Sequence, residues 1–147
     1  METIIKDGNI VIAHCGIRKT DIQVKGEKIF AISKSIGDFK GKKVIDAKGK
    51  YVSPGFIDPH VHLGNTFPFF EDVESETPHA AAGGATTILV FFRAALFDSR
   101  FPSYKKVFKK ILESLREIAY IDFSFHFHIP IETYIDEIPD YCKEYEI

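Results

Sequence analysis

The sequence predicts an α/β protein in which a short all-β segment precedes three parallel βα units. Two observations carry this prediction. Over the first fifty residues, short runs of β-forming side chains alternate with turn residues, which is typical of paired strands. From Tyr51 onward, β runs alternate with helical stretches at a spacing that favours crossovers over hairpins. We therefore expect two domains, an all-β segment over residues 1–52 and an incomplete α/β-barrel domain over residues 53–147.

Turn residues divide the all-β segment into short strands. Asp7-Gly8-Asn9 and Gly26-Glu27 are the two turn signals. We expect strands in the runs 3–6, 10–13, 21–25 and 28–33, paired with one another in antiparallel fashion.

The first βα unit contains a strand over about residues 55–61, a long loop and a short helix. We expect this helix to open at Thr77-Pro78, because Thr is a good N-cap residue and Pro is favoured at the first helical position. Gly83-Gly84 would end it. The second strand, residues 85–92, is apolar throughout, as expected of a strand that is buried on both faces.

The remaining elements follow the same alternation. An amphipathic pattern predicts a helix over about residues 104–119, with its apolar stripe facing the sheet. A third strand covers about residues 121–129, and a helical stretch interrupted by Pro139 continues to Ile147. A closed (β/α)8 barrel needs eight units and about 250 residues. We therefore expect this chain of 147 residues to be a fragment, or to be completed by something else.

Composition excludes several classes of function. The 19 basic and 21 acidic side chains give a net charge of −2, which provides no broad basic surface for nucleic acid. The longest uncharged stretch, residues 77–92, is broken by Pro and Gly, and no signal-peptide pattern follows Met1, so we expect neither a membrane span nor secretion. Cys15 and Cys142 form neither a disulfide framework nor a CxxC pair. We expect them to be buried or inert thiols in a cytoplasmic protein.

The motif with the clearest chemistry is PGFIDPHVH at residues 54–62. Side chains two apart on a strand share a face, so Asp58, His60 and His62 should project to one side. Two imidazoles at this spacing can bind one zinc ion, and a hydrogen bond to Asp58 could orient one of these imidazoles. The pair also lies at the carboxyl end of the first barrel strand, where such barrels keep their active sites.

These residues also carry a family resemblance. The HxH after PGFID and the AAAGGATT junction at residues 80–87 resemble the zinc-dependent cyclic amidohydrolases, above all their hydantoinase and dihydropyrimidinase branch. DFSFH at residues 122–126 resembles the third-strand motif of that branch. The resemblance implies the N-terminal part of a β-sandwich, followed by the first three βα units of a metal-dependent (β/α)8 TIM barrel.

The resemblance further implies a binuclear zinc site in which His60 and His62 bind one metal. Its other ligands would be a carbamylated lysine after strand four, two later histidines and an aspartate, none of which falls within residues 1–147. In such enzymes a metal-activated hydroxide attacks a ring amide carbon, and the late aspartate carries the proton. No catalytic residue is therefore assigned in this chain, and we expect the chain alone to be inactive. The family is usually homo-oligomeric.

Substrate class is expected from the loop after the second histidine. Dihydroorotases typically have an arginine two residues beyond it, where this chain has Gly64, so dihydroorotase activity is disfavoured. The apolar loop 63–70 resembles the hydantoinase loop over the exocyclic substituent, with Asn65 and Phe67 as its lining residues. Hydantoin and dihydropyrimidine rings remain open as substrates. The phenylalanines of this loop could equally pack it onto the barrel rim.

The sequence also allows interpretations other than part of a hydantoinase-like enzyme. His126 and His128 form a second HxH, but the family's ligands do not fall on the third strand, so a four-histidine site is disfavoured. The chain could also be a non-catalytic truncated product or a structural piece that depends on a partner. A free-standing metal-binding module is less suitable, because two ligands on one strand hold zinc weakly.

Overall fold

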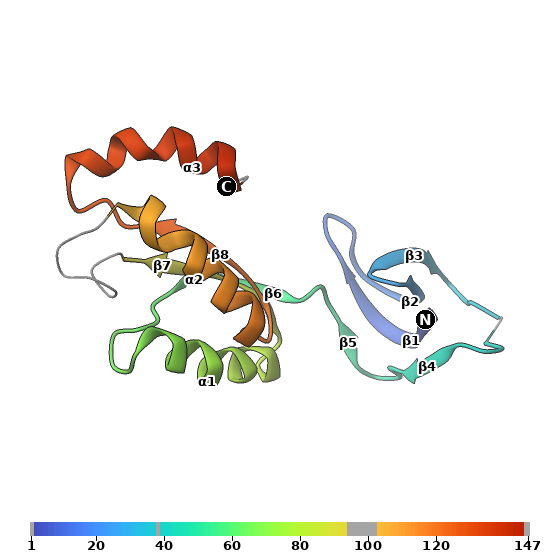
Figure 1. Cartoon of the computed structure of the whole chain (residues 1–147). Helices are drawn as coiled ribbons and strands as arrows, with labels where there is room; N and C mark the ends of the chain where they lie inside the picture. Colours follow the sequence, from blue (N-terminus) through green and yellow to red (C-terminus); the bar gives the residue numbers. More distant parts are fainter. Residues whose placement is uncertain (1, 38, 94–102, 146–147) are drawn as a thin grey trace. The chain divides into compact units, whose positions relative to one another are not determined.

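The computed structural model describes residues 2–37, 39–93 and 103–145 (Figure 1). It divides into two compact units, Met1–Pro54 and Gly55–Ile147. Each unit has its own sheet.

The first unit is a five-stranded sheet with the order β3-β2-β1-β4, in which β5 also pairs with β1. Its strands are β1 (Glu2–Ile12), β2 (Gly16–Lys25), β3 (Lys28–Ser33), β4 (Lys43–Asp46) and β5 (Tyr51–Val52). Strands β1 to β3 are antiparallel, as predicted, and Gly26-Glu27 forms the predicted turn between β2 and β3. Strands β4 and β5 instead run parallel to β1, which corrects the prediction of an antiparallel segment. The long connection after β3 makes this possible, because it returns the chain before β4 begins.

The predicted turn at Asp7-Gly8-Asn9 is a β-bulge inside one long strand. The register between β1 and β2 shifts between Ile5 and Gly8, and Asp7 has a positive φ of 58°. The backbone N–H of Asp7 donates to Oδ1 of Asp21 at 2.9 Å. The buried Asp21 carboxylate therefore satisfies the donor that the bulge removes from the ladder, and the strand continues where a turn was expected.

The second unit is a parallel sheet of three strands in the order β6-β7-β8. Its elements alternate as predicted: β6 (Phe56–Val61), α1 (Phe69–Ala82), β7 (Ala85–Phe92), α2 (Tyr104–Ile118) and β8 (Asp122–Phe127). A 3-10 helix, η2 (Glu132–Glu137), and α3 (Ile138–Tyr145) follow, with the predicted break falling just before Pro139. The fold class is that expected from the sequence, three consecutive βα units after a β-sheet segment.

Helix α1 begins nine residues before the predicted start, in which Pro78 is the first helical residue. It opens at Phe69 after Pro68, and Pro78 lies within it. The Thr77 hydroxyl does not cap the helix, because it donates to the carbonyl of Val73 one turn earlier at 2.7 Å. Glu71 and Asp72 occupy the first turn, where negative charge favours a helix start, and this is the signal that indicates the true beginning.

One face of the parallel sheet forms the core with α1 and α2. Alternate residues of β7, namely Ile88, Val90 and Phe92, are buried against the helices. Tyr104 at the start of α2 is also buried, and its hydroxyl donates to the carbonyls of Phe92 and His128. This bond ties the start of α2 to the carboxyl ends of β7 and β8. The apolar face therefore holds the three strands in register.

Both cysteines are exposed free thiols, so they are not buried, and the expectation that they are inert stays a prediction. Cys15 lies in the turn between β1 and β2, and Cys142 lies on α3. Both positions are in surface elements, where a small apolar side chain can remain in water at little cost. No helix in the described part of the chain is long and apolar enough to cross a membrane.

Candidate metal centre

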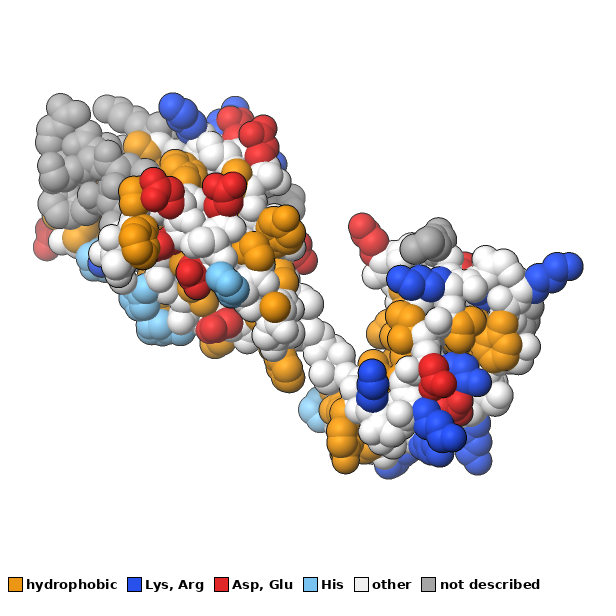
Figure 2. All heavy atoms as spheres, turned by 90° about the horizontal axis from the view of Figure 1, so that it is seen from below, with side chains coloured by type: hydrophobic (Ala, Val, Ile, Leu, Met, Phe, Trp, Pro, Cys, Tyr) orange, Lys and Arg blue, Asp and Glu red, His pale blue; other side chains and the backbone are white. Residues whose placement is uncertain are grey.

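His60 and His62 meet at the carboxyl end of β6. His60 is in the strand and His62 follows its last residue, Val61. Because they are two apart, their side chains project to the same side, and their Nε2 atoms lie 3.0 Å apart. Both imidazoles are exposed, and Figure 2 shows histidine side chains gathered at the surface of this unit. The predicted pair is therefore assembled by strand geometry alone.

The geometry of the pair fits a shared zinc ion. Two nitrogens bound to one tetrahedral zinc at about 2.0–2.1 Å lie about 3.4 Å apart. The 3.0 Å separation found here is close to that value, and without a metal it is a hydrogen bond in which one Nε2–H donates to the other ring. Among the described residues, no group of three or more histidine, cysteine, aspartate or glutamate side chains converges on one point. The described part of the chain therefore offers two imidazoles, and no third side chain, at this point.

Asp58 lies beside the pair but bonds to backbone. Its Oδ1 accepts the backbone N–H of His60 at 3.1 Å. The sequence predicts that Asp58 orients a ligand imidazole, whereas the structure has its carboxylate holding the main chain that carries His60. The effect is still on the position of a ligand, but it acts through the strand and not through a ring N–H.

Phe91 of β7 provides an apolar platform beneath both histidines. Its ring centroid lies 4.4 Å from that of His60 and 4.9 Å from that of His62, with the latter pair stacked at 15°. His126 of β8 also contacts Phe91, at 4.9 Å, and its Nε2 is 2.9 Å from the carbonyl oxygen of Pro59. Since a carbonyl only accepts, Nε2 of His126 carries a proton in this bond and is unavailable as a ligand. This geometry agrees with the view that β8 does not complete a four-histidine site.

The loop after His62 forms one wall of a hollow of about 550 Å³. Asp58, His62, Asn65 and Phe67 all line this hollow, so the structure brings four of the predicted site residues together. Phe67 is 62% exposed and does not pack the loop onto the rim. Gly64 has a φ of 78°, and its N–H donates to Oδ2 of the buried Asp72 at 2.7 Å. Asp72 thus fixes the loop that carries Asn65 and Phe67.

Three residues of this region are missed by the sequence motifs. None of the motifs discussed above includes Phe91, Arg93 or Asp72. The structure has Phe91 under the histidines, Asp72 under the loop, and an Arg93 guanidinium that donates to the side-chain oxygen of Asn65. The signal for Arg93 is its position: it directly follows β7, as Asn65 follows β6, and the carboxyl ends of parallel strands share one edge.

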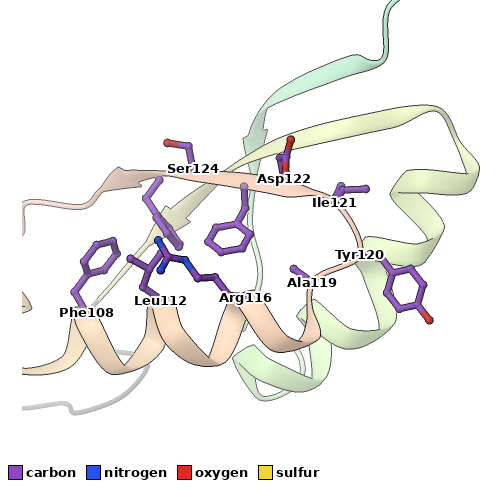
Figure 3. Close-up of a pocket in the computed structure, with 10 residues that line it drawn as sticks. Phe108, Leu112, Arg116, Ala119, Tyr120, Ile121, Asp122 and Ser124 are labelled. Carbon is purple, nitrogen blue, oxygen red and sulfur yellow. The ribbon is translucent and has the colours of Figure 1, made fainter. Parts of the chain in front are cut away.

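A second hollow, of about 520 Å³, lies near the amino end of β8 and contains no histidine (Figure 3). Phe108, Leu112 and Arg116 of α2 extend toward the strand there, whereas Asp122 and Ser124 point away from the helix. The carboxyl ends of the strands, with His60 and His62, lie at the opposite edge of a parallel sheet. This hollow is therefore not the site of the histidine chemistry.

Comparison with known proteins indicates a family resemblance. The model of the amidohydrolase family matches residues 43–96, which include the whole HxH motif. The chain is 36% identical to a D-hydantoinase of Geobacillus stearothermophilus over 98% of its length. The chain is similar to part of the hydantoinase-like amidohydrolases. It spans about 30% of the length of that hydantoinase.

Solved structures of amidohydrolases agree with this assignment. A dihydropyrimidinase from Brevibacillus agri superposes with a TM-score of 0.74 at 27% identity, covering 99% of this chain and 31% of that one. An L-hydantoinase from Arthrobacter aurescens gives 0.75 at 27% identity, covering 96% of this chain and 30% of that one. A dihydroorotase of Lactobacillus helveticus is 34% identical over 97% of this chain and 32% of its own length. Sequence identity alone therefore does not separate the hydantoinase relatives of this chain from its dihydroorotase relatives.

Proposed function

We propose that this chain forms the part of a zinc-dependent cyclic-amide hydrolase that contributes His60 and His62 as ligands of one metal in a binuclear site. The proposed reaction is the ring opening of a hydantoin or a dihydropyrimidine. The observation that carries the proposal is the pair of exposed imidazoles whose Nε2 atoms lie 3.0 Å apart at the carboxyl end of β6. Similarity to the amidohydrolase family supports it, because the relatives of this chain are named for cyclic amides.

The bound metal would supply a Lewis acid and a nucleophile that forms from water at neutral pH. The residues of this chain bind and orient. His60 and His62 would each offer Nε2, so that the remaining proton of each neutral ring is on Nδ1. Phe91 limits the tilt of both rings, and Asp58 fixes the backbone N–H of His60. Asn65 and Phe67 line the hollow beside His62, where they would contact the substituent of the ring substrate.

Two neutral imidazoles are half of a tetrahedral zinc shell and bring no negative charge to balance the metal. The described residues contain no third ligand nearby. We therefore expect residues 1–147 alone to bind zinc weakly and to open no ring. The same observation favours the alternative, in which the chain is a non-catalytic truncated product or a structural piece that depends on a partner.

Metal content and ring opening, measured together, separate these proposals. The protein should be produced both from its whole reading frame and as residues 1–147, each as wild type, His60→Ala, His62→Ala and His128→Ala. His128 is the matched control. Its exposed ring directly follows the end of β8, and only its backbone forms hydrogen bonds. We expect His60→Ala and His62→Ala to lower zinc content and to reduce hydrolysis of hydantoin or dihydrouracil by about 10³-fold.

The outcomes are distinct. Unchanged zinc content in the His60→Ala and His62→Ala variants would refute the metal centre. Zinc-dependent turnover by residues 1–147 alone would refute the expectation that the chain is inactive alone. Zinc binding without turnover by the product of the whole reading frame would favour the non-catalytic alternative.

We also propose that the protein acts in the cytoplasm as a homo-oligomer on a small cyclic amide, without nucleic acid or membrane partners. The two free thiols support a reducing compartment. Light scattering of the purified protein tests the oligomer, since a monomer over the working concentration range would contradict it.

A further inference from the structure

Arg93 lies at the edge of the sheet where the histidines meet. It directly follows Phe92, the last residue of β7, and is two residues beyond Phe91. Residues two apart on a strand share a face, so Arg93 continues the face on which Phe91 contacts His60 and His62. In the described part of the second unit, the other lysines and arginines belong to α2 and α3. Among the described residues, Arg93 is thus the lysine or arginine that lies at this edge.

The contacts of Arg93 leave its charge unbalanced. One Nη donates to Oδ1 of Asn65, which is a neutral acceptor. Its Nε is buried and has no hydrogen-bond partner among the described residues. None of the ion pairs found between described residues includes Arg93. No carboxylate of the described chain therefore lies within ion-pair distance of Arg93.

A buried donor on a charged group is costly when it has no acceptor, and a donor left in this state calls for an explanation. A guanidinium presents its N–H groups as a planar fork that matches the two oxygens of a carboxylate. In Arg93 one N–H is anchored on Asn65 and Nε–H remains for an acceptor from outside the described chain. Asn65 itself lines the hollow beside His62, so this acceptor would lie next to the metal ligands.

We propose that Arg93 binds a carboxylate carried by the ring substrate, so that the enzyme prefers anionic cyclic amides over neutral ones. This inference rests on the proposed function, because it names the class of substrate for the same site. Asn65, which lines the hollow, is a positioning residue that holds the guanidinium of Arg93. The competing explanation is that Arg93 serves only to fix the loop through Asn65, in which case its charge does not matter to the substrate.

A pair of matched substrates separates these explanations. Hydantoin-5-acetate and hydantoin-5-acetamide have nearly the same shape and differ in one negative charge. The protein produced from its whole reading frame and loaded with zinc should be assayed on both, as wild type, Arg93→Gln and Arg116→Gln. Arg116→Gln makes the same change of charge on the exposed end of α2, at the hollow far from the histidines. Glutamine at position 93 keeps an N–H donor for Asn65, so the substitution removes the charge and retains the anchor.

We expect Arg93→Gln to lower kcat/KM for the acetate by about 10- to 100-fold, mainly through KM, and to change kcat/KM for the acetamide by less than about 3-fold. Retained hydrolysis of the acetamide also shows that the variant is folded. Arg116→Gln should leave both values unchanged. Equal losses on the two substrates, or no preference for the acetate in the wild type, would overturn the proposal while leaving the proposed function intact.

Failure of the proposed function gives a different result. If the wild type opens neither ring, calorimetric titration with hydantoin-5-acetate still tests Arg93. Binding that is weakened about 10-fold or more by Arg93→Gln and not by Arg116→Gln would support the anion site without hydrolysis. Binding that is insensitive to Arg93→Gln, or absent, would overturn the anion site as well.

Discussion

The two faces of the parallel sheet in the second unit differ in what determines them. On one face, Ile88, Val90 and Phe92 of β7 are buried by α1 and α2. On the other, Phe91 lies among His60, His62 and His126 and is only partly buried. Neighbouring residues of one strand therefore belong to two different environments. Apolar packing within the unit determines the first face, and polar side chains determine the second.

The comparison indicates that stability and chemistry depend on opposite faces of the sheet. The helix-covered face needs only apolar side chains of suitable size, so many sequences can satisfy it. The histidine face needs particular atoms at particular distances, such as the two Nε2 atoms 3.0 Å apart. Substitutions on the first face should therefore change the free energy of unfolding, and those on the second should change binding.

The sharpest test of this separation is Phe92→Ala, and its effect should be the largest. Phe92 is fully buried and its ring contacts four other aromatic rings, those of Tyr104, Phe108, Phe125 and Phe127. Removing the ring leaves a cavity between the sheet and α2. We expect the free energy of unfolding to fall by about 3–5 kcal/mol, as measured by urea denaturation of the protein from its whole reading frame.

Phe92→Leu serves as the control, because it retains most of the apolar volume. It should cost clearly less than Phe92→Ala. A loss below about 1 kcal/mol for Phe92→Ala would mean that this face does not carry the stability of the unit.

The sequence predicts that β7 is buried, but it does not predict which of its residues face the helices. The uninterrupted apolar run at residues 85–92 predicts a buried strand correctly, but it treats both faces alike. Which residues face the helices depends on where the strand pairs with β6 and β8. The HxH spacing, in contrast, is a local property, and so the pair of imidazoles could be predicted directly.

The next largest effect is expected for Phe91→Ala, on the histidine face. Its ring supports both imidazoles, so its loss lets them rotate away from the geometry of a shared zinc ion. We expect the affinity for zinc to fall by about 10- to 100-fold, measured by competition with a chelating dye. The free energy of unfolding should fall less than for Phe92→Ala.

Phe91→Leu is the informative companion, since it keeps apolar bulk but removes the flat ring. An intermediate zinc affinity would support the role of the platform. If Phe91→Ala destabilised the protein as much as Phe92→Ala while leaving zinc affinity unchanged, the two faces would not differ as described.

A smaller effect is expected where the two helices meet the sheet. The buried Thr77 hydroxyl donates to Val73 of α1 and accepts the backbone N–H of Tyr120, which lies 43 positions further along the chain. Thr77→Val keeps the shape and removes both bonds. We expect a loss of about 1–2 kcal/mol in the free energy of unfolding. Ser114→Ala, which removes a bond to the carbonyl of Lys110 at the surface, should stay within about 0.5 kcal/mol of wild type.

This position also shows why part of the fold is not predictable locally. Thr followed by Pro is a good helix start in isolation, and it gave the wrong beginning for α1. The hydroxyl finds its partner on a residue that follows α2, and the sequence around Thr77 does not reveal that contact. The bond between Arg93 and Asn65 is hidden for the same reason, because it joins the ends of two different strands.

The smallest expected change concerns the loop that joins the two faces. Gly64 has a φ of 78°, and its N–H donates to the buried Asp72. Alanine at this position should cost about 1 kcal/mol, because a Cβ disfavours the left-handed conformation. Gly37→Ala is the control, since Gly37 lies in the first unit with open space around its Cβ position and should be neutral or slightly stabilising. Because Gly64 precedes Asn65, Gly64→Ala should also raise KM for the ring substrate while zinc content stays at the wild-type level. A loss of zinc in Gly64→Ala would instead mean that the loop also determines the positions of the two histidines. Substrate binding and metal binding would then depend on the same loop.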